Sequence, residues 1–253
     1  TIEENVAEIV LDAPEKLNSL DPTGIAQLSA AYDEAAAAGV RALLLRGEGR
    51  AFCAGRDISG VDPREDDVIG YLEGLIEPLM KKMSEFPAPT FAAAHGACLG
   101  VGLGLLVATD VVYVAESAKI GSPFANLGAT LDSGGHALFF ERLGAHRTLD
   151  LIYTGRLMSG TEAVAGGLFS QALHDDEVLG ATQQAVAKAA KGATQAFLAS
   201  KRLVAELRDQ RVGLWASMSN ENRAQAALCD TPDYREGFAA FQEKRRPDLS
   251  GKA

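Results

Sequence analysis

The chain has 253 residues, of which 47% are hydrophobic and 23% charged, and its net charge is −10. This composition is typical of a folded globular protein, and an acidic chain without clustered positive charge excludes a general nucleic-acid or anionic-membrane surface. Three widely spaced cysteines and four scattered histidines indicate neither a disulfide framework nor a metal site. The acidic first residues lack the basic and apolar regions of a signal peptide, so we expect a cytoplasmic protein.

The first half of the chain alternates predicted strands and helices. Short apolar runs predict strands, and apolar residues at helical spacing predict helices. Asp21 followed by Pro22 predicts a helix N-cap, and Gly39 predicts the end of that helix. In chain order the elements are a strand at Val6–Leu11, the helix from Asp21 to Gly39, a strand at Val40–Leu45, a helix with apolar residues from Ile69 to Leu79, a strand at Thr90–Ala94, a helix at Gly100–Thr109 and a strand at Val111–Ala115. This order predicts an α/β fold in which crossover helices cover a sheet.

After Gly134 every predicted element is a helix. These helices are Gly135–Leu143, His146–Tyr153, Thr161–Ala165, Glu177–Ala190, Thr194–Leu207, Val212–Leu228 and Thr231–Lys244. We therefore divide the chain into a core with the active site, residues 1–193, and a helical region for assembly, residues 194–253. The apolar stretch Phe91–Thr109 is as long as a membrane span, but its four central glycines favour a buried strand, a turn and a buried helix.

Two glycine-containing segments could offer backbone N–H groups to a ligand. The segment Ala51–Ile58 reads AFCAGRDI, and its small residues after a buried strand would let the backbone approach an oxygen closely. The segment His95–Gly104 reads HGACLGVGLG, and small residues at the start of a buried helix leave N–H donors that can stabilise a negative oxygen. A plain tight turn explains the first segment equally well, and close strand–helix packing explains the second.

Asp132 is the most informative single residue. It lies between Leu131 and the run Ser133-Gly134-Gly135, about 30 residues after the second glycine segment. Taken alone, it could be the N-cap of the following helix. Taken together, one carboxyl group and two N–H-rich loops suffice for proton transfer next to a thioester carbonyl.

The combined motifs resemble the crotonase superfamily, the enoyl-CoA hydratase/isomerase family. The resemblance runs through AFCAGRDI, HGACLGVGLG, PFANLGATLDSGG, LGAHRTLDLIYTGRLMSG and YREGFAAFQEKRRPDL, and so covers essentially the whole chain. It implies a fold of repeated β-β-α turns with a helical C-terminal trimerisation region. It also implies an acyl-CoA substrate, no separate cofactor or metal, and a homotrimer or hexamer without nucleic-acid or membrane partners.

The resemblance also implies roles for particular residues. The backbone N–H groups of Arg56 and Val101 would form an oxyanion hole, and Asp132 would be the catalytic acid and base. The residues implied to contact coenzyme A are Lys16, Leu17, Ala54, Asp57, Ile58, Phe241 and Lys244. Asp57 could instead hold its own loop.

This chain departs from the hydratases of the family at two positions. Those enzymes carry two glutamates that activate a water, and here Gly104 and Phe124 stand at the matching positions. We therefore expect a double-bond isomerase that relies on Asp132. Three alternatives stay open, namely a hydratase-like lyase, a dehalogenase or hydrolase with Asp132 as nucleophile and His136 as base, and a non-catalytic acyl-CoA-binding homologue.

Overall fold

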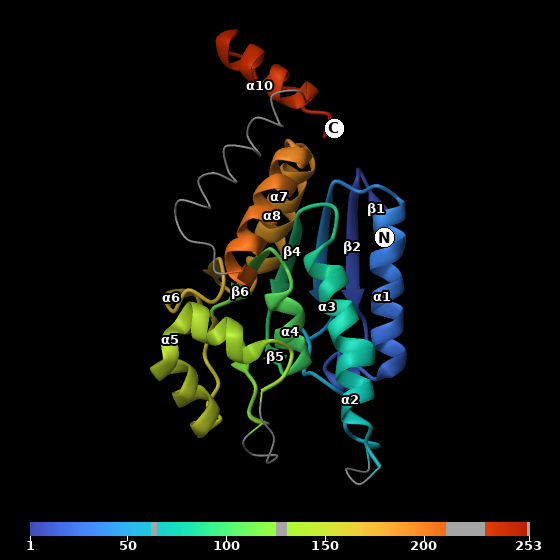
Figure 1. Cartoon of the computed structure of the whole chain (residues 1–253), viewed down its shortest axis with the longest axis vertical. Coiled ribbons are helices and arrows are strands. Elements are labelled where there is room, and N and C mark those ends of the chain that lie inside the picture. The colour runs from blue at the N-terminus through green and yellow to red at the C-terminus, as the bar shows by residue number, and fades with distance from the viewer. Residues whose placement is uncertain (62–64, 125–130, 211–230, 252–253) are drawn as a thin grey trace.

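A computed structural model describes residues 1–61, 65–124, 131–210 and 231–251 and contains one six-stranded sheet (Figure 1). Neighbouring strands are parallel except for the first pair, and their order is β1-β2-β3-β4-β6-β8. The strands are β1 (Ile2–Glu3), β2 (Val6–Leu11), β3 (Ala42–Gly47), β4 (Thr90–Ala94), β6 (Val111–Ala115) and β8 (Gln171–Leu173). The parallel order confirms the predicted α/β arrangement, because parallel strands require crossover connections.

Helices cover the sheet and bury its central strands. All five residues of β4 are buried, as expected for a parallel strand with both faces covered. Helix α7 (Val178–Ala190) packs against β3, β4 and β6, whereas α1 (Pro22–Ala37) contacts β2 and α3 (Glu77–Ser84). The predicted start of α1 is confirmed, since the Asp21 carboxylate accepts a hydrogen bond from the Gly24 N–H at 2.7 Å.

A second, smaller layer of strands leads to the site. Strands β5 (Ala97–Leu99) and β7 (Lys119–Gly121) pair in parallel, and single bridges add Cys53 and Met158 to this layer. The chain therefore repeats a pattern in which a strand of the large sheet is followed by a short strand and then by a helix. The clearest repeats are β4-β5-α4, with α4 at Val101–Val107, and β6-β7-α5, with α5 at Gly135–Thr154. These are the β-β-α turns that the resemblance implied.

Several predicted boundaries differ from the structure. Strands β1, β5, β7 and β8 have only two or three residues, too few to show a hydrophobic period. The helix predicted around Ile69–Leu79 consists of α2 (Val68–Tyr71), a π-helical turn η2 (Leu72–Ile76) and α3. The two helices predicted between residues 135 and 153 form one element, α5, with a kink at Gly144, where φ is 78° and ψ is 167°.

The remaining α-helices of the described residues are α6 (Gly160–Ala165), α8 (Thr194–Gln210) and α10 (Pro232–Gln242). They match predicted helices, whereas the helix predicted at Val212–Leu228 lies outside the described residues. In Figure 1, α7 and α8 overlap in the view, and α10 lies above them. Within the described part of the chain, no helix is long and apolar enough to cross a membrane.

Candidate active site

The first element of the site is the loop that follows β3. The Leu20 N–H donates to the Gly55 carbonyl at 2.8 Å, and the Asp57 N–H donates to the Leu20 carbonyl at 2.9 Å. Because successive peptide groups of an extended chain point to opposite sides, this pairing turns the Arg56 N–H away from Leu20. Gly55 permits the turn with a φ of 101°, a conformation that L side chains rarely adopt.

The second element is the start of α4. Val101 is the first residue of this helix, so its N–H has no carbonyl one turn earlier within the helix. The preceding Gly100 has a φ of 52° and a ψ of −120°, which again favours glycine. A Cβ placed on Gly55 would lie 3.6 Å from the Val101 nitrogen. The fold therefore brings together two loops that lie about 45 residues apart in the sequence.

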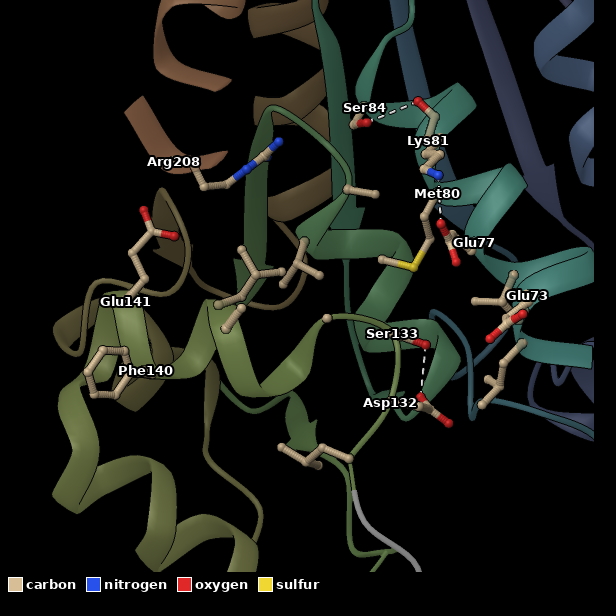
Figure 2. Close-up of a pocket in the computed structure, with 18 of the residues that line it drawn as sticks. Glu73, Glu77, Met80, Lys81, Ser84, Asp132, Ser133, Phe140, Glu141 and Arg208 are labelled. Atoms are coloured by element: carbon tan, nitrogen blue, oxygen red, sulfur yellow. Dashed lines mark hydrogen bonds and ion pairs between the residues drawn. The ribbon is translucent and has the colours of Figure 1, made fainter. Parts of the chain in front are cut away.

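The third element is Asp132, which precedes α5 (Figure 2). The Ser133 hydroxyl donates to Asp132 Oδ1 at 2.8 Å. Gly134, not Asp132, is the N-cap of α5, and no side chain caps this helix. The N-cap interpretation of Asp132 is therefore wrong, and the carboxylate faces the cavity described below.

The environment of Asp132 favours its protonated form. Burial raises the pKa of the Asp132 carboxyl above its usual value, and the hydrogen bond from Ser133 and the charge of Arg56 oppose this rise. A carboxyl group with a raised pKa is a stronger base when it is ionised.

The Arg56 side chain is held by two partners. Its guanidinium donates to both Asp66 oxygens at 2.8 and 2.6 Å, and its Cζ lies 3.9 Å from the ring centre of Tyr71. Such a two-pronged ion pair fixes the orientation of the guanidinium. Neither Asp66 nor Tyr71 was identified from the sequence, because a polar loop residue and a helical tyrosine carry no distinctive spacing.

Four of the residues predicted to contact coenzyme A form one strip. The Ala54 N–H donates to the Leu17 carbonyl at 2.9 Å, and Lys16 Nζ lies 3.7 Å from Asp57 Oδ2. Asp57 Oδ1 also accepts hydrogen bonds from the Ser59 N–H and hydroxyl at 3.1 and 2.7 Å. These bonds favour the interpretation that Asp57 holds its own loop.

The other three predicted contact residues are less closely placed. Ile58 follows Asp57 and is 52% exposed. Lys244 is exposed beyond the end of α10, and no described contact joins it to the strip. The side chain of Phe241 lies outside the described part of the structure.

A cavity of about 1050 Å³ opens beside Asp132 and Ser133. Figure 2 shows it between α3 and η2 on one side and α5 on the other. Its wall combines apolar residues with acids other than Asp132. The apolar residues include Leu72, Ile76, Met80, Val107, Leu131 and Leu138, and the acids are Glu73, Glu77 and Glu141. These three glutamates are exposed, whereas Asp132 is partly buried. Among the residues that the structure describes, no group of three or more His, Cys, Asp or Glu side chains could hold a metal ion.

The two positions where hydratases carry glutamates lie beside these elements. A Cβ on Gly104 would lie 2.7 Å from the Ser133 Cβ, and a Cβ on Gly100 would lie 3.2 Å from Phe124 Cζ. Gly104 therefore borders the turn that carries Asp132, and Phe124 covers the glycine before Val101. Both positions face the site, but neither supplies a group that can transfer a proton.

The β-β-α turns and the two apposed loops are those of a crotonase fold. The family model for enoyl-CoA hydratase/isomerase matches residues 1–252. The chain belongs to the enoyl-CoA hydratase/isomerase family.

Similar proteins carry both activities in their names. The 1,2-epoxyphenylacetyl-CoA isomerase of Escherichia coli K12 is 32% identical over 99% of this chain and 97% of its own length. The human mitochondrial enoyl-CoA hydratase domain-containing protein 2 is 34% identical over 99% of this chain and 87% of its own length. The crystal structure of an enoyl-CoA hydratase from Bacillus anthracis superimposes with a TM-score of 0.89 at 28% identity, covering 98% of this chain and 96% of that one.

Proposed function

We propose that the protein is an enoyl-CoA isomerase that shifts a double bond from Δ3 to Δ2 by proton transfer through Asp132. The observation that carries this proposal is a single partly buried carboxyl group of raised pKa beside the two N–H-bearing loops. Gly104 and Phe124 support it, because a two-glutamate hydration needs acids at those positions. The E. coli relative named as an isomerase is consistent with the same chemistry.

In the proposed mechanism, the thioester oxygen accepts hydrogen bonds from the Arg56 and Val101 N–H groups. Asp132 removes a proton from C2 and the C3–C4 double bond electrons delocalise into a dienolate. The protonated carboxyl then delivers the same proton to C4, which leaves a double bond between C2 and C3. Each N–H group would lower the barrier by about 3 kcal/mol, because it stabilises charge that develops on the oxygen.

Hydration is the second candidate, and one observation favours it. Glu73 and Glu77 line the same cavity as Asp132, so a second carboxyl group is available to orient a water. Relatives named as hydratases are consistent with this route. Both glutamates are exposed, whereas Asp132 is partly buried.

One panel of substrates separates the two candidates. Paired 3-enoyl-CoA and 2-enoyl-CoA thioesters of several chain lengths are offered as substrates, and product analysis measures isomerisation and hydration separately. The isomerase proposal expects turnover of the 3-enoyl thioesters and little hydration of the 2-enoyl ones. Hydration of 2-enoyl-CoA that is lost on Glu73→Gln would favour the second candidate. Capture of a covalent acyl adduct on Asp132 would instead identify a nucleophilic dehalogenase or hydrolase.

Asp132→Asn tests the role of the carboxyl group directly. We expect kcat to fall by about 10²–10⁴-fold, since general acid–base catalysis is worth that much. Coenzyme A affinity should change only a few-fold. The matched control is Glu141→Gln, which removes an acid from the exposed wall of the same cavity and should leave kcat unchanged. Near-normal turnover by Asp132→Asn would overturn the one-acid mechanism.

We also propose that residues 194–253 assemble the protein into a homotrimer or a dimer of trimers in the cytoplasm. Large apolar side chains that are exposed on α5 and α8 support this proposal, because such surfaces are usually covered by a partner. They are Phe140, Leu149, Tyr153, Phe197, Val204 and Leu207. In such an assembly we expect Trp215, Met218, Phe238 and Phe241 to be partly buried against neighbouring subunits; their side chains lie outside the described part of the structure. Sedimentation at micromolar concentration should give at least the trimer mass, and a monomer would contradict the proposal.

A further inference from the structure

The contact between Gly104 and Ser133 links two positions that are 29 residues apart. A Cβ on Gly104 would lie 2.7 Å from the Ser133 Cβ and 3.2 Å from its Oγ. Real Cβ atoms do not approach other carbon atoms this closely, so only glycine at position 104 leaves room for Ser133. Gly104 therefore does more than omit a glutamate, because it provides the space that another side chain occupies.

Ser133 itself has an unusual backbone conformation. Its φ is 52°, in the left-handed region, where a residue with a Cβ is strained and glycine is not. Glycine would be the less strained residue here, yet the chain carries serine. The only hydrogen bond described for its hydroxyl in the structure joins it to Asp132 Oδ1, at 2.8 Å. Backbone strain at a site residue is consistent with a functional role for its side chain.

We infer that Ser133 is the positioning residue of Asp132, and that Gly104 is the residue that allows it to take this place. The inference rests on the proposed function, in which Asp132 transfers the proton. The hydroxyl binds Oδ1 and thereby fixes the carboxylate, leaving Oδ2 to remove and return the proton. Figure 2 shows this second oxygen pointing away from Ser133.

The same hydrogen bond regulates the basicity of Asp132. Burial raises the pKa of the carboxyl group, and the Ser133 hydroxyl lowers it by stabilising the charged form. The other titratable groups close to Asp132 or across the cavity are Arg56, Tyr71, Glu73, Glu77, Lys81, His136, Glu141 and Arg208. Arg56 also favours the carboxylate, whereas negative charge on the glutamates would disfavour it. Ser133 carries no charge, so its contribution can be removed without altering the net charge of the site.

Two substitutions separate the hydroxyl from the backbone. Ser133→Ala removes the hydroxyl and keeps the Cβ, whereas Ser133→Gly removes both and relieves the left-handed strain. Both should raise the pKa of the Asp132 carboxyl, because each deletes a hydrogen bond that stabilises the charged form. The acid limb of kcat/KM against pH should then move to higher pH by the same amount. If Ser133 only shaped the turn, Ser133→Ala and Ser133→Gly would differ in their effects, because only glycine relieves the left-handed strain. Neither variant would then move the acid limb of kcat/KM.

Gly104→Ala tests the steric half of the inference. The new methyl group should displace Ser133 and move the acid limb in the same direction as Ser133→Ala. In the background of Ser133→Gly the side chain that clashes is absent, so Gly104→Ala should have little further effect. Such non-additivity is the signature of two residues in contact. Independent effects of the two substitutions on the pH profile would overturn the steric link.

The decisive measurement is a ¹³C NMR titration of the Asp132 carboxyl in the unliganded full-length protein and its variants. It needs no substrate, so it reports on Ser133 even if the proposed isomerase reaction is wrong. A raised carboxyl pKa in both Ser133→Ala and Ser133→Gly supports the inference, and an unchanged pKa in either overturns it. Loss of turnover in Asp132→Asn is the separate test of the reaction itself. Thermal unfolding of each variant confirms that the comparison is made on folded protein.

Discussion

A methyl group at Gly55 should disable the proposed oxyanion hole while leaving substrate binding largely intact. A Cβ at this position would lie 2.9 Å from the Leu99 carbonyl oxygen and 3.6 Å from the Val101 nitrogen. The loop that carries the Arg56 N–H must therefore move away from the start of α4 by a few tenths of an ångström or more. Hydrogen bonds to a developing oxyanion depend steeply on such distances, and loss of one donor costs about 10²–10³-fold in kcat.

The same substitution should also destabilise the protein. The φ of Gly55 is 101°, so alanine would be strained by about 1–3 kcal/mol. Steady-state kinetics on the preferred 3-enoyl-CoA give kcat and KM, and urea denaturation gives the free energy of unfolding. We expect a large fall in kcat with a KM that changes only a few-fold, because the N–H groups bind the transition state more tightly than the substrate.

Gly39→Ala is the matched control. Gly39 also has a positive φ, 65°, but a Cβ there would meet no atom within 4 Å, and it lies at the end of α1, away from the site. It should cost about 1–2 kcal/mol of stability and leave kcat unchanged. If Gly55→Ala lost stability to a similar extent and kept its kcat, the assignment of the Arg56 and Val101 N–H groups would be refuted.

Two further predictions concern binding and stability. Lys16→Ala and Lys244→Ala should raise KM by less than about fivefold and leave kcat nearly unchanged, since an exposed ion pair is worth at most about 1 kcal/mol. The increase in KM should be smaller at high salt, because salt screens exposed charges. A large loss of kcat would place these residues in the active site instead. Asn18→Ala should lower the free energy of unfolding by about 2–4 kcal/mol in urea denaturation, because buried Asn18 accepts from the Ala13 N–H and donates to the Glu48 and Ala51 carbonyls at 2.8, 2.9 and 2.8 Å. A loss below about 1 kcal/mol would show that water replaces these bonds.

Local patterns in the sequence determined much of the fold. Asp21-Pro22 marks the start of α1 and Gly39 marks its end, because capping depends on residues within one turn of the helix end. Strand β4 was predicted with its observed bounds, since a short apolar run between turns is a local signal. The sequence also singled out Asp132, because an acid beside a Gly-Gly pair stands out within an apolar stretch, and its catalytic role stays a prediction.

Contacts between distant segments were decided only by the tertiary structure. The three-residue strands β5 and β7 are stabilised by pairing with each other rather than by their own sequences, so no hydrophobic periodicity predicts them. The ion pair of Arg56 with Asp66 and the contact of Gly104 with Ser133 depend on how whole elements pack, and residue spacing carries no record of that packing. The sequence therefore pointed to Asp132 as the candidate acid, whereas only the fold placed the Ser133 hydroxyl on its carboxylate and Gly104 beside Ser133.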